Sequence, residues 1–242
     1  MLGLDLWVVA VLAATLTVGA AVQGLVGLGL GLVAAPVIAL VVPALMPDLL
    51  LWMAAALPMV TLARERDAVD WRGLAWALPA RVPGTGVGVV CVATFTDRQL
   101  GVAVALMVLS AVLVTARAVV VPVTSATLLA AGFVSGVAGT ATSVGGPPLA
   151  VLYQHRPPEQ IRCTLAVYFL AGAVLSLAGL GAAGALEVRA GLLALLLLPC
   201  LVVGFGLSRL VADRLRARHV RPAVLAVCAT SSLVLLARSL LS

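Results

Sequence analysis

Long apolar stretches follow one another along this chain of 242 residues, and only short polar loops separate them. A helix of about 20 apolar residues is long enough to cross the hydrocarbon core of a membrane. The pattern resolves into four blocks in each half of the chain. They are Leu2–Met46, Asp48–Leu62, Trp71–Thr94 and Leu100–Val121, followed by Val123–Gln154, Arg162–Leu186, Val188–Leu210 and Ala223–Leu241. We therefore expect an all-α integral membrane domain without a separate soluble domain.

The first block of each half contains a glycine and proline motif that interrupts its apolar run. The motif recurs at a constant offset of 112 residues, so that Gly24, Gly27 and Pro36 correspond to Gly136, Gly139 and Pro148. Corresponding helix interruptions in two halves of a membrane protein are a pointer to the binding site of a transporter. The motif predicts two diverged repeats, residues 1–121 and 122–242, within one membrane domain.

The block Val123–Gln154 also predicts a broken helix by its length. An unbroken helix over these residues would extend about 48 Å at 1.5 Å per residue, which is too long for one straight crossing. We expect each first block to form a hairpin or broken helix that enters and leaves the membrane on one side. Each half then crosses the membrane three times, and the two repeats are inverted.

The arginines favour this inverted arrangement. All fifteen basic residues are arginine. The inverted arrangement places eleven of them in the cytoplasm, including Arg64, Arg66 and the loop 209–221, and three outside, with Arg81 inside a span. If each first block crossed once instead, the distribution would be eight against six. Cytoplasmic loops carry an excess of basic residues, so the inverted arrangement is preferred.

Inversion would bring the two interruptions together near the middle of the membrane. Broken backbone at that depth must be buried in protein or line a wet cavity. A half-helix beginning near Gly145-Gly146-Pro147 would present free N–H groups and the positive end of a helix dipole, which suits an anion. The alternative is close helix packing through small residues. We prefer packing for Gly84 and Gly88, and a site for Gly145, Gly146 and Pro148.

Several polar residues near the interruptions are candidate ligands. The hydroxyls of Thr140, Thr142 and Ser143 could bind a ligand or equally satisfy backbone carbonyls. Arg81, inside a span, is either an anion ligand or an arginine that snorkels to an interface. For Arg162 three roles are open: an anchor in a cytoplasmic loop, a gate or a ligand. For Gln23 two roles are open: a polar residue that lines a pore, or one that forms a hydrogen bond to another helix. The candidate substrate-binding set is Gly29, Gly31, Pro36, Arg81, Thr140, Thr142, Ser143, Gly145, Gly146, Pro147, Pro148 and Arg162.

Missing motifs narrow the function further. The chain has no phosphate-binding GxxxxGK[ST] loop, no catalytic Ser/His/Asp set and only two histidines, so we expect no enzyme activity, cofactor or metal. Nucleic acid is not an expected partner, because the basic residues lie in short loops between apolar spans. All nine acidic residues fall in loops or at the edges of spans, which argues against proton coupling through a buried carboxylate.

Two motifs of the second half are distinctive, Gly145-Gly146-Pro147-Pro148-Leu-Ala-Val-Leu-Tyr153 and Arg162-Cys-Thr-Leu-Ala-Val-Tyr-Phe169. Together with the glycine-rich run of the first half that ends at Pro36, they resemble the sulfite exporter TauE/SafE family. The resemblance implies a multi-spanning permease or exporter, in a prokaryotic inner membrane, for sulfite, organosulfonates or related small anions. A non-transporting membrane anchor for partner proteins is the alternative. Membrane lipid is an expected partner, and both a monomer and a homodimer fit the apolar exterior.

Overall fold

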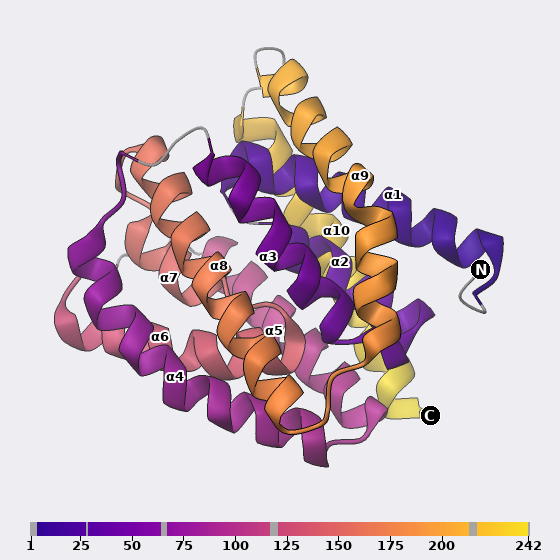
Figure 1. Ribbon diagram of the computed structural model, residues 1–242. Helices are drawn as coiled ribbons and strands as arrows, with labels where there is room; N and C mark the ends of the chain where they lie inside the picture. Colours follow the sequence, from indigo (N-terminus) through magenta and orange to yellow (C-terminus); the bar gives the residue numbers. More distant parts are fainter. Residues whose placement is uncertain (1–3, 28, 64–66, 117–120, 213–216, 242) are drawn as a thin grey trace.

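Helices account for most of the residues that the structure describes (Figure 1). The computed structural model describes residues 4–27, 29–63, 67–116, 121–212 and 217–241. Arg64 and Arg66, and Arg214 and Arg216 of the loop 209–221, lie outside the described residues. The helices are α1 (Leu6–Val26), α2 (Leu30–Val41), α3 (Asp48–Leu62), α4 (Trp71–Thr94), α5 (Asp97–Ala116), α6 (Ser125–Thr142), α7 (Pro147–Tyr153), α8 (Pro158–Ala182), α9 (Val188–Ala212) and α10 (Ala217–Leu241), with a short 3-10 helix at Pro43–Leu45.

Seven of the helices in the described ranges are long and apolar enough to cross a membrane. The helices α2 and α3 are also apolar but shorter, and α7 has only 7 residues. Large apolar side chains such as Trp76, Leu195 and Val202 are at least half exposed on the outside of the bundle, where a lipid would cover them. The prediction of an all-α, multi-pass membrane protein is confirmed.

Four helix pairs build the bundle. The most extensive packing joins α4 to α6 and α1 to α9, followed by α5 with α10 and α3 with α8. The helices α3 and α8 lie side by side in the middle of the bundle and run antiparallel (Figure 1). Leu51 near the start of α3 packs with Leu177 and Leu180 near the end of α8, whereas Thr61 at the end of α3 lies across a small cavity from Arg162.

Glycines allow α4 and α6 to approach until their backbones touch. A Cβ atom added at Gly84 would lie 2.2 Å from the carbonyl oxygen of Phe133, and one at Gly132 would lie 2.2 Å from that of Ala77. A Cβ atom at Gly88 would lie 2.6 Å from the Cβ of Thr140 on α6. Small residues at helix interfaces permit this contact in membranes. The packing interpretation of Gly84 and Gly88 is confirmed.

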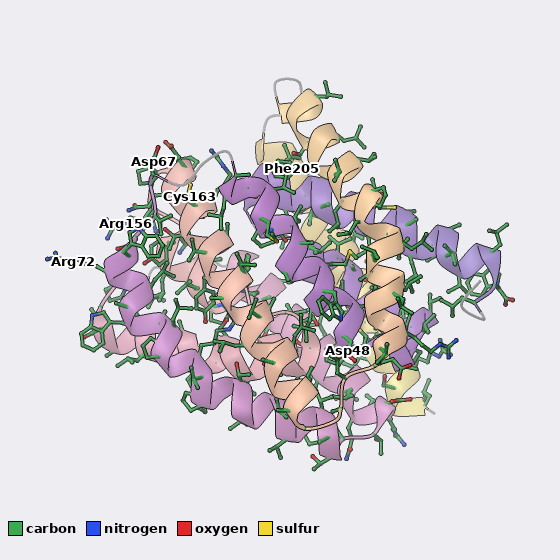
Figure 2. All side chains as sticks on the ribbon, viewed as in Figure 1. Asp48, Asp67, Arg72, Arg156, Cys163 and Phe205 are labelled. Atoms are coloured by element: carbon green, nitrogen blue, oxygen red, sulfur yellow. The ribbon has the colours of Figure 1, made fainter. Side chains whose placement is uncertain are left out.

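Hydrogen bonds tie helices together at the two ends of the bundle. At one end the N–H of Asp70, just before α4, donates to the Thr164 hydroxyl of α8 over 3.0 Å. At the other end the N–H of Glu187, just before α9, donates to the Asp48 carboxylate of α3 over 2.6 Å. Figure 2 shows Asp67, Arg72 and Arg156 together at the first end and Asp48 at the far end of α3.

Paired glycines in α4 allow a matched test of this packing. A Cβ atom at Gly86 would meet no atom within 4 Å, in contrast to Gly84. We expect Gly84→Ala to lower stability by about 1–3 kcal/mol through overpacking. Gly86→Ala should instead be neutral or raise stability by up to about 1 kcal/mol, because alanine is the better helix former. Thermal unfolding in detergent measures both, and equal losses for the two variants would contradict the packing account.

The carboxylate of Asp70 predicts a pH dependence of stability. Burial acts to raise the pKa of Asp70, but hydrogen bonds from the Gly73 N–H (3.0 Å) and the Tyr153 hydroxyl (2.7 Å) hold it below its ordinary value of 3.8. The stabilisation is therefore complete above 3.8 and lost as the pH falls through that value towards the folded-state pKa.

Tyr153→Phe removes one of these hydrogen bonds and should cost about 1 kcal/mol at neutral pH. The difference in melting temperature between the wild type and this variant should narrow as the pH falls below 3.8. A difference that is independent of pH would contradict the assignment of this stabilisation to ionised Asp70.

Candidate functional site

The first interruption separates α1 from α2. The helix α1 ends at Val26, and Gly27 follows with a φ of 86°, in the left-handed region that favours glycine. The side-chain oxygen of Gln23 accepts a hydrogen bond from the N–H of Leu30 over 3.1 Å. Gln23 thereby caps the first turn of α2 from the last turn of α1. The N–H groups of Gly31 and Leu32 belong to the same first turn and have no partner within the helix.

The second interruption separates α6 from α7. The helix α6 ends at Thr142, and Ser143 follows in the left-handed region with a φ of 59°, which is uncommon for a residue other than glycine. The Ser143 hydroxyl donates to the carbonyl of Pro47 over 2.8 Å, which ties the second interruption to the start of α3. The helix α7 begins with Pro147 and Pro148, so its first two residues have no N–H to donate.

The two interruptions meet around one space, the central cavity. A Cβ atom added at Gly31 would lie 2.5 Å from the carbonyl oxygen of Ser143, so the two breaks are in close contact. The central cavity has a volume of about 50 Å³. One water needs roughly 10–15 Å³, so there is room for a few waters or one small oxyanion. Its lining includes Gln23, Gly29, Gly31, Leu50, Leu51, Ala54, Arg81, Ser143, Gly145, Gly146, Pro147, Phe169 and Ala173.

Arg81 supplies the positive charge at the central cavity. It lies in α4 between Pro79 and Pro83 and is only 3% exposed. Its Nη1 donates to the Ser135 hydroxyl over 3.4 Å, and its guanidinium carbon lies 4.5 Å from the centre of the Tyr168 ring. Burial at this depth excludes the alternative in which Arg81 snorkels to an interface.

Ser135 connects this arginine to the second interruption. Its hydroxyl accepts the hydrogen bond from Arg81 and donates to the carbonyl oxygen of Gly145. A Cβ atom at Gly172 of α8 would lie 1.9 Å from the guanidinium carbon of Arg81, so this position must be glycine for the guanidinium to lie where it does. The side chain is therefore held by α6 and α8 against the wall formed by the second interruption.

The charge of Arg81 is incompletely satisfied. Its Nε is buried without a hydrogen-bond partner, and no acidic side chain in the described ranges forms an ion pair with it. A charged side chain at the centre of a membrane helix costs at least about 2.5 kcal/mol. An aromatic ring and a neutral hydroxyl compensate only part of this cost. An anion in the central cavity would supply the missing counter-charge.

Five residues of the predicted set lie outside the central cavity. Thr140 shares a 2.7 Å hydrogen bond with Ser176, and Thr142 donates to the Ala138 carbonyl over 2.7 Å. Thr142 thus satisfies a backbone carbonyl, as the alternative interpretation expected, whereas Thr140 bonds another side-chain hydroxyl. The other three are Pro36, buried inside α2, Pro148, which lines a separate groove with α5 and α6, and Arg162, which lines a smaller cavity.

Sequence reasoning also missed residues that the structure places at the site. Ser135, Tyr168 and Gly172 hold Arg81, and Phe169 lines the central cavity. Tyr168 and Phe169 lie in the segment that carries the family resemblance, and this resemblance could have identified them as candidate site residues. Ser135 and Gly172 carry no such signal, because small residues are common in apolar helices.

Comparison with known proteins agrees with this architecture. The bundle and its apolar exterior define a multi-pass membrane protein. The family model for the sulfite exporter TauE/SafE family matches residues 11–235, and the chain belongs to this transporter family. The expected resemblance is thus confirmed. Neither a curated protein nor a solved structure matches the chain significantly.

The contact between Gly172 and Arg81 yields a test of the site. Gly172→Ala should displace the guanidinium, because the added methyl group would overlap it. Gly181→Ala, on the same helix, would meet only one atom at 3.9 Å and is the matched control. Sulfite should raise the melting temperature of the wild type and of Gly181→Ala, and this shift should be lost in Gly172→Ala. An undiminished shift in Gly172→Ala would contradict the site.

Proposed function

We propose that this protein is a secondary permease that exports small anions such as sulfite or organosulfonates. The anion binds near the middle of the membrane, between the two helix interruptions. One observation carries the proposal: Arg81 is 3% exposed, lacks an acidic partner among the described residues and lines a cavity to which both interruptions contribute. An arginine buried in this way requires a counter-charge, and an anionic substrate provides one only while it is bound.

An inverted pair of repeats, residues 1–121 and 122–242, explains how two interruptions reach one cavity. The helix α2 leads to the end of the bundle where α3 begins, and α7 leads to the end where α8 begins. Since α3 and α8 run antiparallel, α2 and α7 leave the cavity towards opposite ends. Each repeat also ties its second block to the third block of the other, through Asp48 with Glu187 and through Thr164 with Asp70.

The ligands proposed for the anion combine charge with backbone donors. Arg81 provides the charge, and the N–H groups of Gly31 and Leu32 are free in the first turn of α2. Gly145 and Gly146 allow the substrate to approach the backbone closely on the opposite wall. The volume of about 50 Å³ favours a compact oxyanion such as sulfite over larger organosulfonates in this conformation.

Export of an anion needs no coupling ion in this arrangement. We place the end of the bundle with Arg72, Arg156 and Arg162 in the cytoplasm of a prokaryotic inner membrane, in accordance with the positive-inside rule. An anion that leaves a cell with a negative interior gains about 2.3 kcal/mol per charge for each 100 mV. The alternative function, a non-transporting anchor, is not favoured, because it gives no reason to retain a buried Arg81.

Flux through proteoliposomes tests the proposal. Saturable uptake of radiolabelled sulfite is expected for the wild type. Arg81→Gln should reduce it by about 30-fold or more, because truncating a buried charged contact costs 2 kcal/mol or more. Arg72→Gln, on an exposed arginine at the start of the same helix, is the control and should transport normally. Equal transport by Arg81→Gln and the wild type would contradict the role of Arg81.

A further inference from the structure

A second, smaller cavity lies next to the central one. This access cavity has a volume of about 20 Å³, and its lining includes Thr61 of α3 and Arg162 of α8. This volume holds about one water, so an anion can occupy the access cavity only when the cavity widens. Gln23 and Phe169 line both cavities and therefore stand between them. The access cavity lies towards the end of the bundle where α8 begins, which is the end that carries Arg72 and Arg156.

The helix α8 presents one continuous face to both cavities. Arg162, Ala166, Phe169 and Ala173 follow one another at spacings of three or four residues, which places them on the same side of a helix. Arg162 and Ala166 line the access cavity, and Ala173 lines the central cavity. Phe169 lies at the transition, about 10 Å along the helix from Arg162.

The opposing helix α3 has the matching pattern. Pro58 and Thr61 line the access cavity, and Leu51 and Ala54 line the central cavity, again at spacings of three or four residues. Since α3 and α8 are antiparallel, these two cavity-lining faces oppose each other along the interface between the two helices, which we call the seam. Both cavities lie along this seam, and each contains one arginine.

The seam is closed differently on the two sides of the central cavity. Towards the end where α3 begins, Leu51, Leu177 and Leu180 form a buried apolar cluster with further apolar side chains of α4. Such a cluster offers an anion no polar partner. Towards the other end, Gln23 and Phe169 line both the central cavity and the access cavity, so these two side chains lie at the junction of the two cavities.

We infer that the access cavity is a second anion position on the route to Arg81, with Arg162 as its charge and Phe169 as the gate between the two positions. This inference rests on the proposed anion transport and adds its route. The anion first meets Arg162 and then passes Phe169 to reach Arg81. Gln23 remains in place, because its side-chain oxygen caps α2 through the Leu30 N–H.

Substituted cysteines test the gate. In a folded, membrane-inserted variant with Cys91, Cys163, Cys200 and Cys228 replaced by alanine, one cysteine is introduced at Thr61 or at Ala54. An impermeant anionic methanethiosulfonate is applied from the side of Arg162. Thr61→Cys should react fast, and Ala54→Cys at least about tenfold more slowly, because minor open states are populated at about 10% or less.

Phe169→Ala should raise the reaction rate of Ala54→Cys by about tenfold or more, because it removes the gate that slows this reaction. The reaction rate of Thr61→Cys should not change. The control is Phe133→Ala, which removes an equal side chain that is 41% exposed on the outside of α6. It should change neither rate. Equal rates at Ala54→Cys with and without Phe169, or reaction there only from the opposite side, would overturn the gate.

The charge of the reagent tests the second position separately. At Thr61→Cys the anionic reagent should react faster than a cationic one of similar size, and Arg162→Gln should remove this preference. A preference that survives Arg162→Gln would overturn the second position. These measurements require no transport of sulfite. If sulfite flux fails while the labelling results hold, the proposed substrate is wrong and the route stands.

Discussion

The candidate site depends on the burial of one positive charge. Arg81 lies inside the membrane domain at 3% exposure, and the chain places around it a hydroxyl, an aromatic ring and a glycine instead of a carboxylate. A permanent acidic partner would neutralise the arginine and leave no role for an anion. A neutral surrounding keeps the guanidinium in position and leaves its charge available. The helix interruptions then supply the open space and backbone donors beside it.

The sequence predicts some of this arrangement because some of its causes are local. The apolar blocks reveal the membrane helices. Arg81, a charged residue between two prolines in an apolar block, is identified as a candidate functional residue by its position alone. The groups that hold Arg81 could not be found in this way. Ser135 and Gly172 are 54 and 91 positions away from it, and only the packing of α4 against α6 and α8 brings them near. Thr140 and Thr142 show the converse, since hydroxyls beside the interruption are used by the protein itself.

The same packing explains how the site can work in transport. Glycine contacts hold α4 against α6 and α1 against α9 in close packing. The antiparallel helices α3 and α8 pack against both of these pairs and carry both cavities on their facing sides. One end of their seam is filled by leucines, and at the other end Phe169 and Gln23 lie where the two cavities meet. We propose that the leucine cluster at one end and the junction at Phe169 at the other open in turn, which would give alternating access.

The most direct measurement of the central claim is a crystal structure of the protein with selenite, which replaces the sulfur of sulfite by an anomalous scatterer. The account predicts an anomalous peak in the central cavity, within hydrogen-bond distance of Arg81 and close to Gly31 and Gly145. A cavity without the anion at saturating selenite, or a peak whose oxygens do not contact Arg81, would contradict the claim that this buried arginine is the anion ligand.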